Sequence, residues 1–96
     1  RVGELTADIC RKLLDDVVLA AEDDLERAIT LFATVEKTVA EGAGAAGLAA
    51  LLARPDLFKG RKVVLILCGG NIDTRLLASV LTRSLVREKR LTSVRI

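Results

Sequence analysis

The stretch LILCGGNID, residues 65–73, carries the strongest fold signal in the sequence. An apolar run ends there at a cysteine, Cys68, and two glycines follow directly. The whole run, VVLILC over residues 63–68, is apolar throughout, which is typical of a central parallel strand covered on both faces. The pattern therefore predicts a buried strand with a thiol at its tip, followed by a turn that has almost no side chains.

Helix and strand patterns alternate along the rest of the chain. Apolar residues recur at helical spacing in four segments, namely 4–15, 21–37, the small-residue stretch that ends at 53, and a last helix through 76–85. Short apolar runs predict strands at four places, namely 15–20, a brief piece near 38–41, 63–68 and 91–96. This alternation predicts an α/β fold with a mainly parallel sheet and helices on both faces, formed by residues 1–96 as a single segment.

The composition indicates one small globular unit with an aliphatic core. Of the 96 residues, 51% are apolar and 29% are charged, which excludes a disordered chain. Two Phe are the only aromatic residues, so we expect a core of Leu, Val, Ile and Ala. The net charge is +2, and the one basic stretch, RSLVREKR at 83–90, has no aromatic residue for base stacking. We expect a solvated helix end there rather than a nucleic-acid site.

Other residue types exclude further classes of function. The chain has two cysteines and no histidine, which excludes the zinc patterns, so no metal site is predicted. No stretch reaches the roughly 18 apolar residues that a membrane span needs. The N-terminus carries no secretory pattern, and a reduced, cytoplasmic setting is expected.

The stretch GAGAAG at 42–47 fits the G-x-G-x-x-G fingerprint of dinucleotide-binding turns. The match is weak, because Gly and Ala fill this whole region and the preceding strand has at most four residues. Glu41 would also place a negative charge beside the incoming phosphates. Close packing of a helix against its neighbours is the favoured explanation for these glycines.

The turn CGGNID at 68–73 has two interpretations. As a structural element, it is a tight strand-to-helix turn in which Asn71, Asp73 or Thr74 caps the next helix. As a functional element, it is a ligand site at the carboxyl end of a parallel strand, where open α/β sheets bind their ligands. The residues alone leave both interpretations open.

Three stretches together closely resemble the threonine dehydratase family: DDVVLAAEDDLERAI (15–29), VAEGAGAAGLAALLA (39–53) and KGRKVVLILCGGNIDTRLLASVL (59–81). These are fold-type II enzymes that use pyridoxal phosphate (PLP). The similarity covers essentially the whole chain. It implies a fragment of the tryptophan synthase β-like fold, from the C-terminal third of a catalytic domain.

The resemblance also implies a cofactor site. In that family the residue before Gly-Gly-Asn is Ser or Cys and hydrogen-bonds the pyridine nitrogen of PLP, a role that falls here to Cys68. Gly69 and Gly70 would leave room for the ring. Glu41 matches the family's conserved acid beside the cofactor pocket, with a charge at the N-terminus of the next helix as the alternative explanation.

The implied reaction is a β-elimination that converts L-threonine or L-serine to a 2-oxo acid and ammonia, by a cytoplasmic and homo-oligomeric lyase of amino-acid metabolism. The family's Schiff-base lysine lies earlier in the enzyme, so no catalytic residue is predicted in this segment. Five lysines are present, and none sits in the family's lysine motif: Lys12, Lys37, Lys59, Lys62 and Lys89. We therefore expect the isolated chain to be inactive. A serine racemase-like enzyme and a non-catalytic α/β interaction module are the alternatives.

Overall fold

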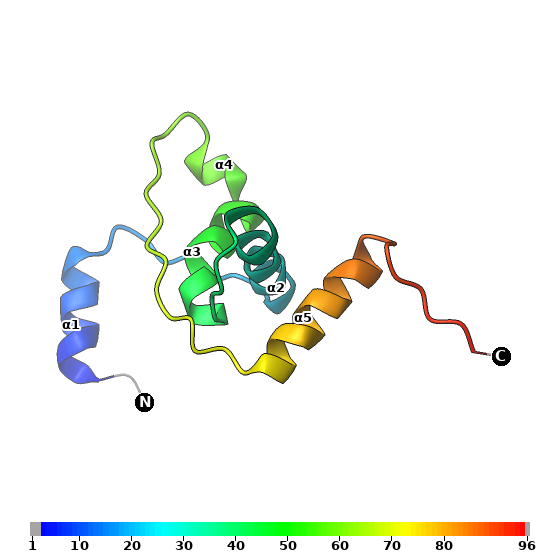
Figure 1. Ribbon diagram of the computed structural model, residues 1–96. Helices are drawn as coiled ribbons and strands as arrows, with labels where there is room; N and C mark the ends of the chain where they lie inside the picture. The colour runs from blue at the N-terminus through cyan, green and yellow to red at the C-terminus, as the bar shows by residue number, and fades with distance from the viewer. Residues whose placement is uncertain (1–2, 96) are drawn as a thin grey trace.

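The structure is a computed structural model and describes residues 3–95 (Figure 1). The helices in chain order are α1 (Glu4–Leu13), α2 (Glu22–Leu31), the π-helix η1 (Phe32–Glu36), α3 (Gly42–Ala53), α4 (Pro55–Phe58) and α5 (Thr74–Arg87). Helix α2 lies at the centre and packs against both α3 and α5, whereas α1 stands apart from them (Figure 1). The end of the predicted strand at Ile96 lies outside the described residues.

Residues 3–95 form no β-sheet, so the predicted α/β fold with a parallel sheet is wrong for this chain. The segments that were predicted as strands run between the helices without pairing (Figure 1). Their apolar, β-branched residues favour an extended backbone locally, but a strand completes its hydrogen bonds only with a neighbouring strand. Within the described residues, one backbone hydrogen bond joins two of these segments, from the N–H of Glu41 to the carbonyl of Gly69 at 2.9 Å.

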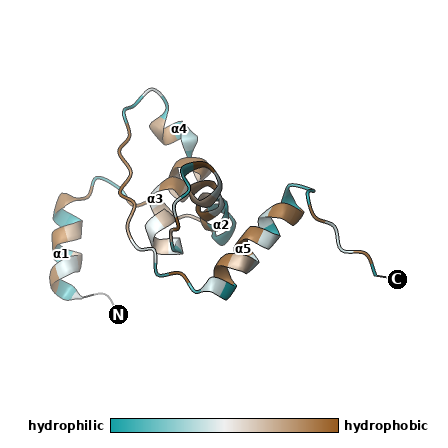
Figure 2. Ribbon diagram, viewed as in Figure 1, coloured by the Kyte–Doolittle hydropathy of each residue, from teal (hydrophilic) through white to brown (hydrophobic). Residues whose placement is uncertain are grey.

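The segment 63–68 is covered on one face only, contrary to the prediction of a strand covered on both. Val63, Leu65 and Leu67 are 38%, 37% and 40% exposed, whereas Val64 and Ile66 are 91% and 81% exposed. This alternation is that of an extended chain resting on a surface. Figure 2 shows the apolar segment running along the outside of the helices.

The core lies between α2, α3 and α5 and consists mainly of alanine. The apolar face predicted for α2 is confirmed, because Ala28 and Ile29 are buried and Leu25 and Phe32 pack against them. The remaining buried apolar residues are Ala40, Ala45, Ala49 and Val80. No leucine is fully buried among residues 3–95, which corrects the expected core of larger aliphatic residues. Small side chains let α2 and α3 approach closely, at the cost of little apolar area per residue.

Three helix predictions need correction at their ends. Helix α3 begins at Gly42 itself, so the glycines lie inside its first turns rather than in a turn before it. The helix predicted over 21–37 changes to a π-helix at Phe32 and ends at Lys37, whose φ of 57° is left-handed. The predicted loop at 54–62 contains the short helix α4, which has a proline at its first turn, where proline is favourable.

Helix α1 forms as its apolar spacing predicts, but that apolar face has no cover. Leu5 and Leu13 are 76% and 75% exposed, and Ile9 is 48% exposed. The dimensions agree with an open shape: the radius of gyration is 16.0 Å, against about 12.5 Å for a compact chain of this length. The accessible surface is 7989 Å², against roughly 5,400 Å² for a compact monomer of this mass.

A cluster of charged side chains joins α5 to α2. Glu26 is the centre of the cluster and its side chain is only 15% exposed. It accepts hydrogen bonds from Arg83 Nε at 2.8 Å and from Arg87 Nη2 at 2.8 Å, and Arg87 also contacts Asp23 at 3.3 Å. Two cations of the basic stretch 83–90 therefore pair with acids of α2, so that stretch is not simply a solvated helix end.

These contacts make stability depend on pH. The hydrogen bond from Arg83, followed by the contact with Arg87, holds the pKa of Glu26 below its ordinary value of 4.5. Because the folded pKa is the lower one, the pair stabilises the fold above pH 4.5, and this contribution is lost as the pH falls through the folded pKa. We expect Glu26→Gln to lower the free energy of unfolding by about 1 kcal/mol at pH 7. The loss should be close to zero at pH 3.

Urea unfolding of both proteins at pH 7 and pH 3 measures this effect. Glu22→Gln is the matched control, because Glu22 lies on the exposed first turn of the same helix. An equal loss in both variants would contradict the prediction. So would a loss for Glu26→Gln that is unchanged at pH 3.

Candidate functional site

The candidate site lies where the end of the 63–70 segment meets the first turn of α3. The backbone N–H of Glu41 donates to the carbonyl of Gly69 at 2.9 Å. Gly70 lies beside Val39, since a Cβ atom at Gly70 would be 3.2 Å from the carbonyl oxygen of Val39. The structure thus brings Glu41 next to the Cys68–Gly70 turn, although the two are well separated in the sequence.

The turn packs on α3 through Gly44. This residue is buried, and a Cβ atom there would overlap the carbonyl oxygen of Cys68 and lie 2.8 Å from the carbonyl oxygen of Gly69. By contrast, a Cβ atom at Gly42 would meet nothing within 4 Å. Close packing is therefore confirmed as the reason for the second glycine of the GAGAAG stretch.

Glu41 occupies the N-cap position of α3, but its side chain makes no capping hydrogen bond. Its carboxylate instead lies against Gly69, where a Cβ atom would be 2.9 Å from the Glu41 Cδ atom and still closer to Oε1. Gly69 has a φ of 75°, in the left-handed region that glycine adopts without strain. The carboxylate is thus directed at the turn, and this geometry favours the pocket interpretation of Glu41 over hydrogen-bonded capping.

The residues of the turn are open on the side away from α3. Cys68 is a free and exposed thiol, and Gly69 and Gly70 are exposed as well. A thiol can form a hydrogen bond with a ring nitrogen, and two residues without side chains let a flat ring approach the backbone. This donor set fits the pyridine side of PLP.

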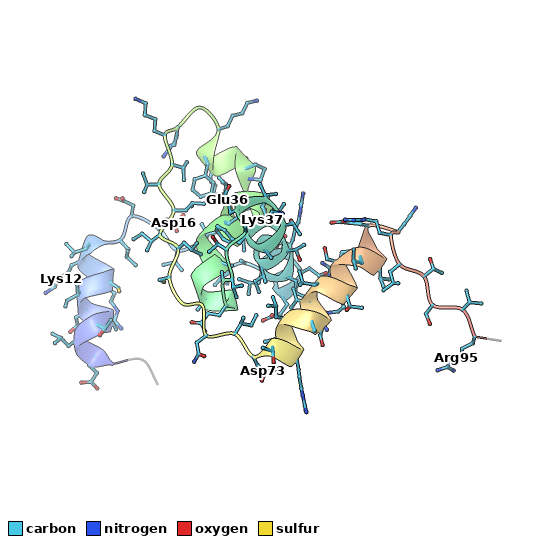
Figure 3. The ribbon with its side chains drawn as sticks, viewed as in Figure 1. Lys12, Asp16, Glu36, Lys37, Asp73 and Arg95 are labelled. Atoms are coloured by element: carbon cyan, nitrogen blue, oxygen red, sulfur yellow. The ribbon has the colours of Figure 1, made fainter. Side chains whose placement is uncertain are left out.

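The same turn also serves the structure, through Asp73. Its Oδ1 atom accepts hydrogen bonds from the backbone N–H groups of Arg75 at 2.8 Å and Leu76 at 3.1 Å, so Asp73 caps α5 (Figure 3). Of the three candidate caps named from the sequence, Asp73 is the one that acts. The two interpretations of CGGNID are compatible, because the capping residue and the exposed thiol lie at opposite ends of the stretch.

All five lysines are exposed, as predicted. Lys12 lies on α1, away from the turn, and Lys37 donates from Nζ to the carbonyl of Thr34 at 2.5 Å (Figure 3). Among residues 3–95, no group of three or more His, Cys, Asp or Glu side chains is placed to hold a metal ion. In the same part of the chain, no helix has the length and apolar character needed to cross a membrane.

Sequence reasoning missed two features. One is the role of Gly44, whose signal was present in its place between two motifs but needed a partner to interpret. The other is a mainly apolar cavity of about 430 Å³ between η1, α3 and the 63–68 segment. Its apolar lining comprises Leu31, Phe32, Val35, Leu48, Leu65 and Leu67.

The sequence of the pyridoxal-phosphate dependent enzyme family matches residues 1–69, and this chain belongs to that family. The resemblance to threonine dehydratases is confirmed. The chain is 39% identical to an L-threonine ammonia-lyase of Thermotoga maritima over 92% of its own length and 22% of the relative. It is 44% identical to a catabolic L-threonine dehydratase of Escherichia coli over 76% of its length and 23% of that protein.

An L-threonine ammonia-lyase of Geobacter sulfurreducens is 39% identical over 98% of this chain and 23% of its own length. The chain therefore spans about a fifth of the length of the curated relatives it matches. Glu41, Cys68 and Gly69 lie within the family match, and Gly70 follows directly after it.

Proposed function

We propose that the chain is a segment of the catalytic domain of a PLP-dependent threonine dehydratase and forms the pyridine-nitrogen side of its cofactor pocket. The longer protein that contains it is called the full-length protein. Its reaction is the β-elimination that converts L-threonine or L-serine to a 2-oxo acid and ammonia. One observation carries the proposal: the exposed Cys68–Gly70 turn is held on α3 by the hydrogen bond from Glu41 to Gly69.

Each residue of the turn has a distinct task in this proposal. PLP, when bound, supplies the electron sink for elimination. The Cys68 thiol forms a hydrogen bond with the ring nitrogen, and unlike a carboxylate it brings no formal negative charge that would hold that nitrogen protonated. Gly69 and Gly70 leave space for the ring. The Glu41 carboxylate, packed against Gly69, keeps the turn at its place on α3.

Two further parts of the proposal concern the rest of the protein. We place the lysine that binds PLP outside residues 1–96, because the five lysines here are exposed and none lies in the family's lysine motif. We also propose a cytoplasmic homo-oligomer. A serine racemase-like activity is the second candidate within the same family of enzymes.

The isolated 96-residue chain is expected neither to bind PLP covalently nor to deaminate L-threonine. The test mixes the purified chain with PLP, reduces it with borohydride and maps labelled lysines by mass spectrometry. Scattered labelling at low stoichiometry is the expected result, since the lysines are equally exposed. A stoichiometric adduct on one lysine, together with 2-oxobutanoate production, would contradict the prediction.

The full-length protein provides the positive arm of this test. It should carry one PLP per chain and release 2-oxobutanoate from L-threonine. Chiral analysis of L-serine incubations separates the two candidate activities, because a racemase yields D-serine and a dehydratase yields pyruvate. A full-length protein that binds no PLP would refute the proposed function and favour the non-catalytic interaction module.

A further inference from the structure

We propose that Gly44 is a positioning residue, which sets how closely the Cys68–Gly70 turn docks on α3 and so where the Cys68 side chain is held. The part of this inference that concerns cofactor binding rests on the proposed function. The part that concerns the position of the thiol rests on the structure alone.

The contacts of the glycines in α3 single out Gly44. A Cβ atom there would overlap the carbonyl oxygen of Cys68 and lie 2.8 Å from the Cys68 carbonyl carbon. Both partners are backbone atoms, so no side-chain rotation relieves the overlap. At Gly47 the contact is with the Leu65 side chain at 3.4 Å, which can move, and at Gly42 there is open space. Gly44 is therefore the glycine of this helix that backbone contact requires.

The turn has little freedom to move away while keeping its other contacts. Gly69 accepts the hydrogen bond from the Glu41 N–H, lies against the Glu41 carboxylate and holds a left-handed φ of 75°. A methyl group at Gly44 would lift the turn from α3 and stretch that hydrogen bond. Cys68, the residue in contact with Gly44, would be displaced with it. Misplacement of a functional group by about 1 Å can lower the rate on the order of 100-fold.

The experiment compares Gly44→Ala with Gly42→Ala in the full-length protein. The two variants add the same methyl group to the same helix, and only the first one meets backbone. Two measurements use the cofactor-free protein: the rate at which the Cys68 thiol reacts with an aromatic disulfide, and the hydrogen exchange of the Glu41 amide. Gly44→Ala should change the thiol rate at least threefold and speed the exchange, whereas Gly42→Ala should leave both within twofold of the unmodified protein.

A third measurement addresses the cofactor. Gly44→Ala should weaken PLP binding by about 10-fold or more, equivalent to about 1.4 kcal/mol. A double-mutant cycle with Cys68→Ala shows whether the loss acts through the thiol. If it does, Gly44→Ala costs clearly less affinity when Cys68 is already alanine. Fully additive losses would mean that Gly44 serves stability only and would overturn the inference.

The outcomes separate this inference from the proposed function. Thiol and exchange rates equal to those of Gly42→Ala would overturn the positioning role, whatever happens to PLP binding. Altered rates with unchanged PLP affinity would support the positioning role and refute the proposed cofactor site. If Gly44→Ala does not fold, Gly70→Ala disturbs the same turn more mildly, since its Cβ atom would be 3.2 Å from the Val39 carbonyl. A thiol rate unchanged in that variant would overturn the inference.

Discussion

Cys68→Ala in the full-length protein is expected to fold normally and to lose about 1–3 kcal/mol in PLP binding or turnover. The alanine leaves the ring nitrogen without a hydrogen-bond partner, while the exposed position of Cys68 means that little core packing is lost. PLP titration, steady-state kinetics and the melting temperature measure the three quantities separately. Cys68→Ser is the conservative control and should keep most of the activity, because a hydroxyl also donates a hydrogen bond.

Cys68→Asp extends this series in the opposite direction. A carboxylate facing the pyridine nitrogen favours its protonated form and so raises the nitrogen's pKa. We expect slower elimination, a red-shifted absorbance in the presence of substrate and more transamination by-product. If alanine keeps full activity and aspartate lowers only the melting temperature, Cys68 is not the partner of the cofactor.

The isolated 96-residue chain is expected to self-associate at micromolar concentration. Its accessible surface of 7989 Å² exceeds that of a compact monomer by about 2,600 Å². Contiguous apolar patches beyond a few hundred Å² are rare on soluble monomers and usually mark interfaces. Val64 and Ile66 on the open face of the 63–68 segment, and Leu5 and Leu13 on α1, are among the exposed residues.

Sedimentation velocity at several concentrations, with binding of a hydrophobic dye, measures the association. The double variant Val64→Lys, Ile66→Lys tests which surface is responsible. These side chains are 91% and 81% exposed, so charges there should reduce association without unfolding the helices. Helical content by circular dichroism is the control. A compact monomer at high concentration that binds little dye would contradict the prediction.

Much of the helical structure and the composition of the candidate site could be predicted from the sequence. The apolar spacing of Leu25, Ala28, Ile29 and Phe32 predicted the face that α2 packs on the core, because helical periodicity is a local property. Cys68, Gly69, Gly70 and Glu41 were named from motif resemblance. The structure places these four residues together, and their binding of PLP remains the subject of the tests above.

The predicted sheet shows where sequence reasoning failed. VVLILC has the composition of a strand covered on both faces, yet only one face of it is covered here. Composition reports how well a residue fits an extended, buried backbone and says nothing of whether a partner strand lies within reach. Sheet formation depends on pairing between segments distant in the chain, and in residues 3–95 those segments share a single backbone hydrogen bond.

By itself the sequence determined the local conformations, the family and the residues that the family's site requires. Helical periodicity, the Asp73 cap and the left-handed glycine all act over a few neighbouring residues, so their signals are legible without coordinates. Only the tertiary structure decided which face of 63–68 is covered, and that Gly44 lies under the Cys68 carbonyl. The reason is steric: two backbones can touch only where neither carries a side chain, and that condition joins residues 24 positions apart.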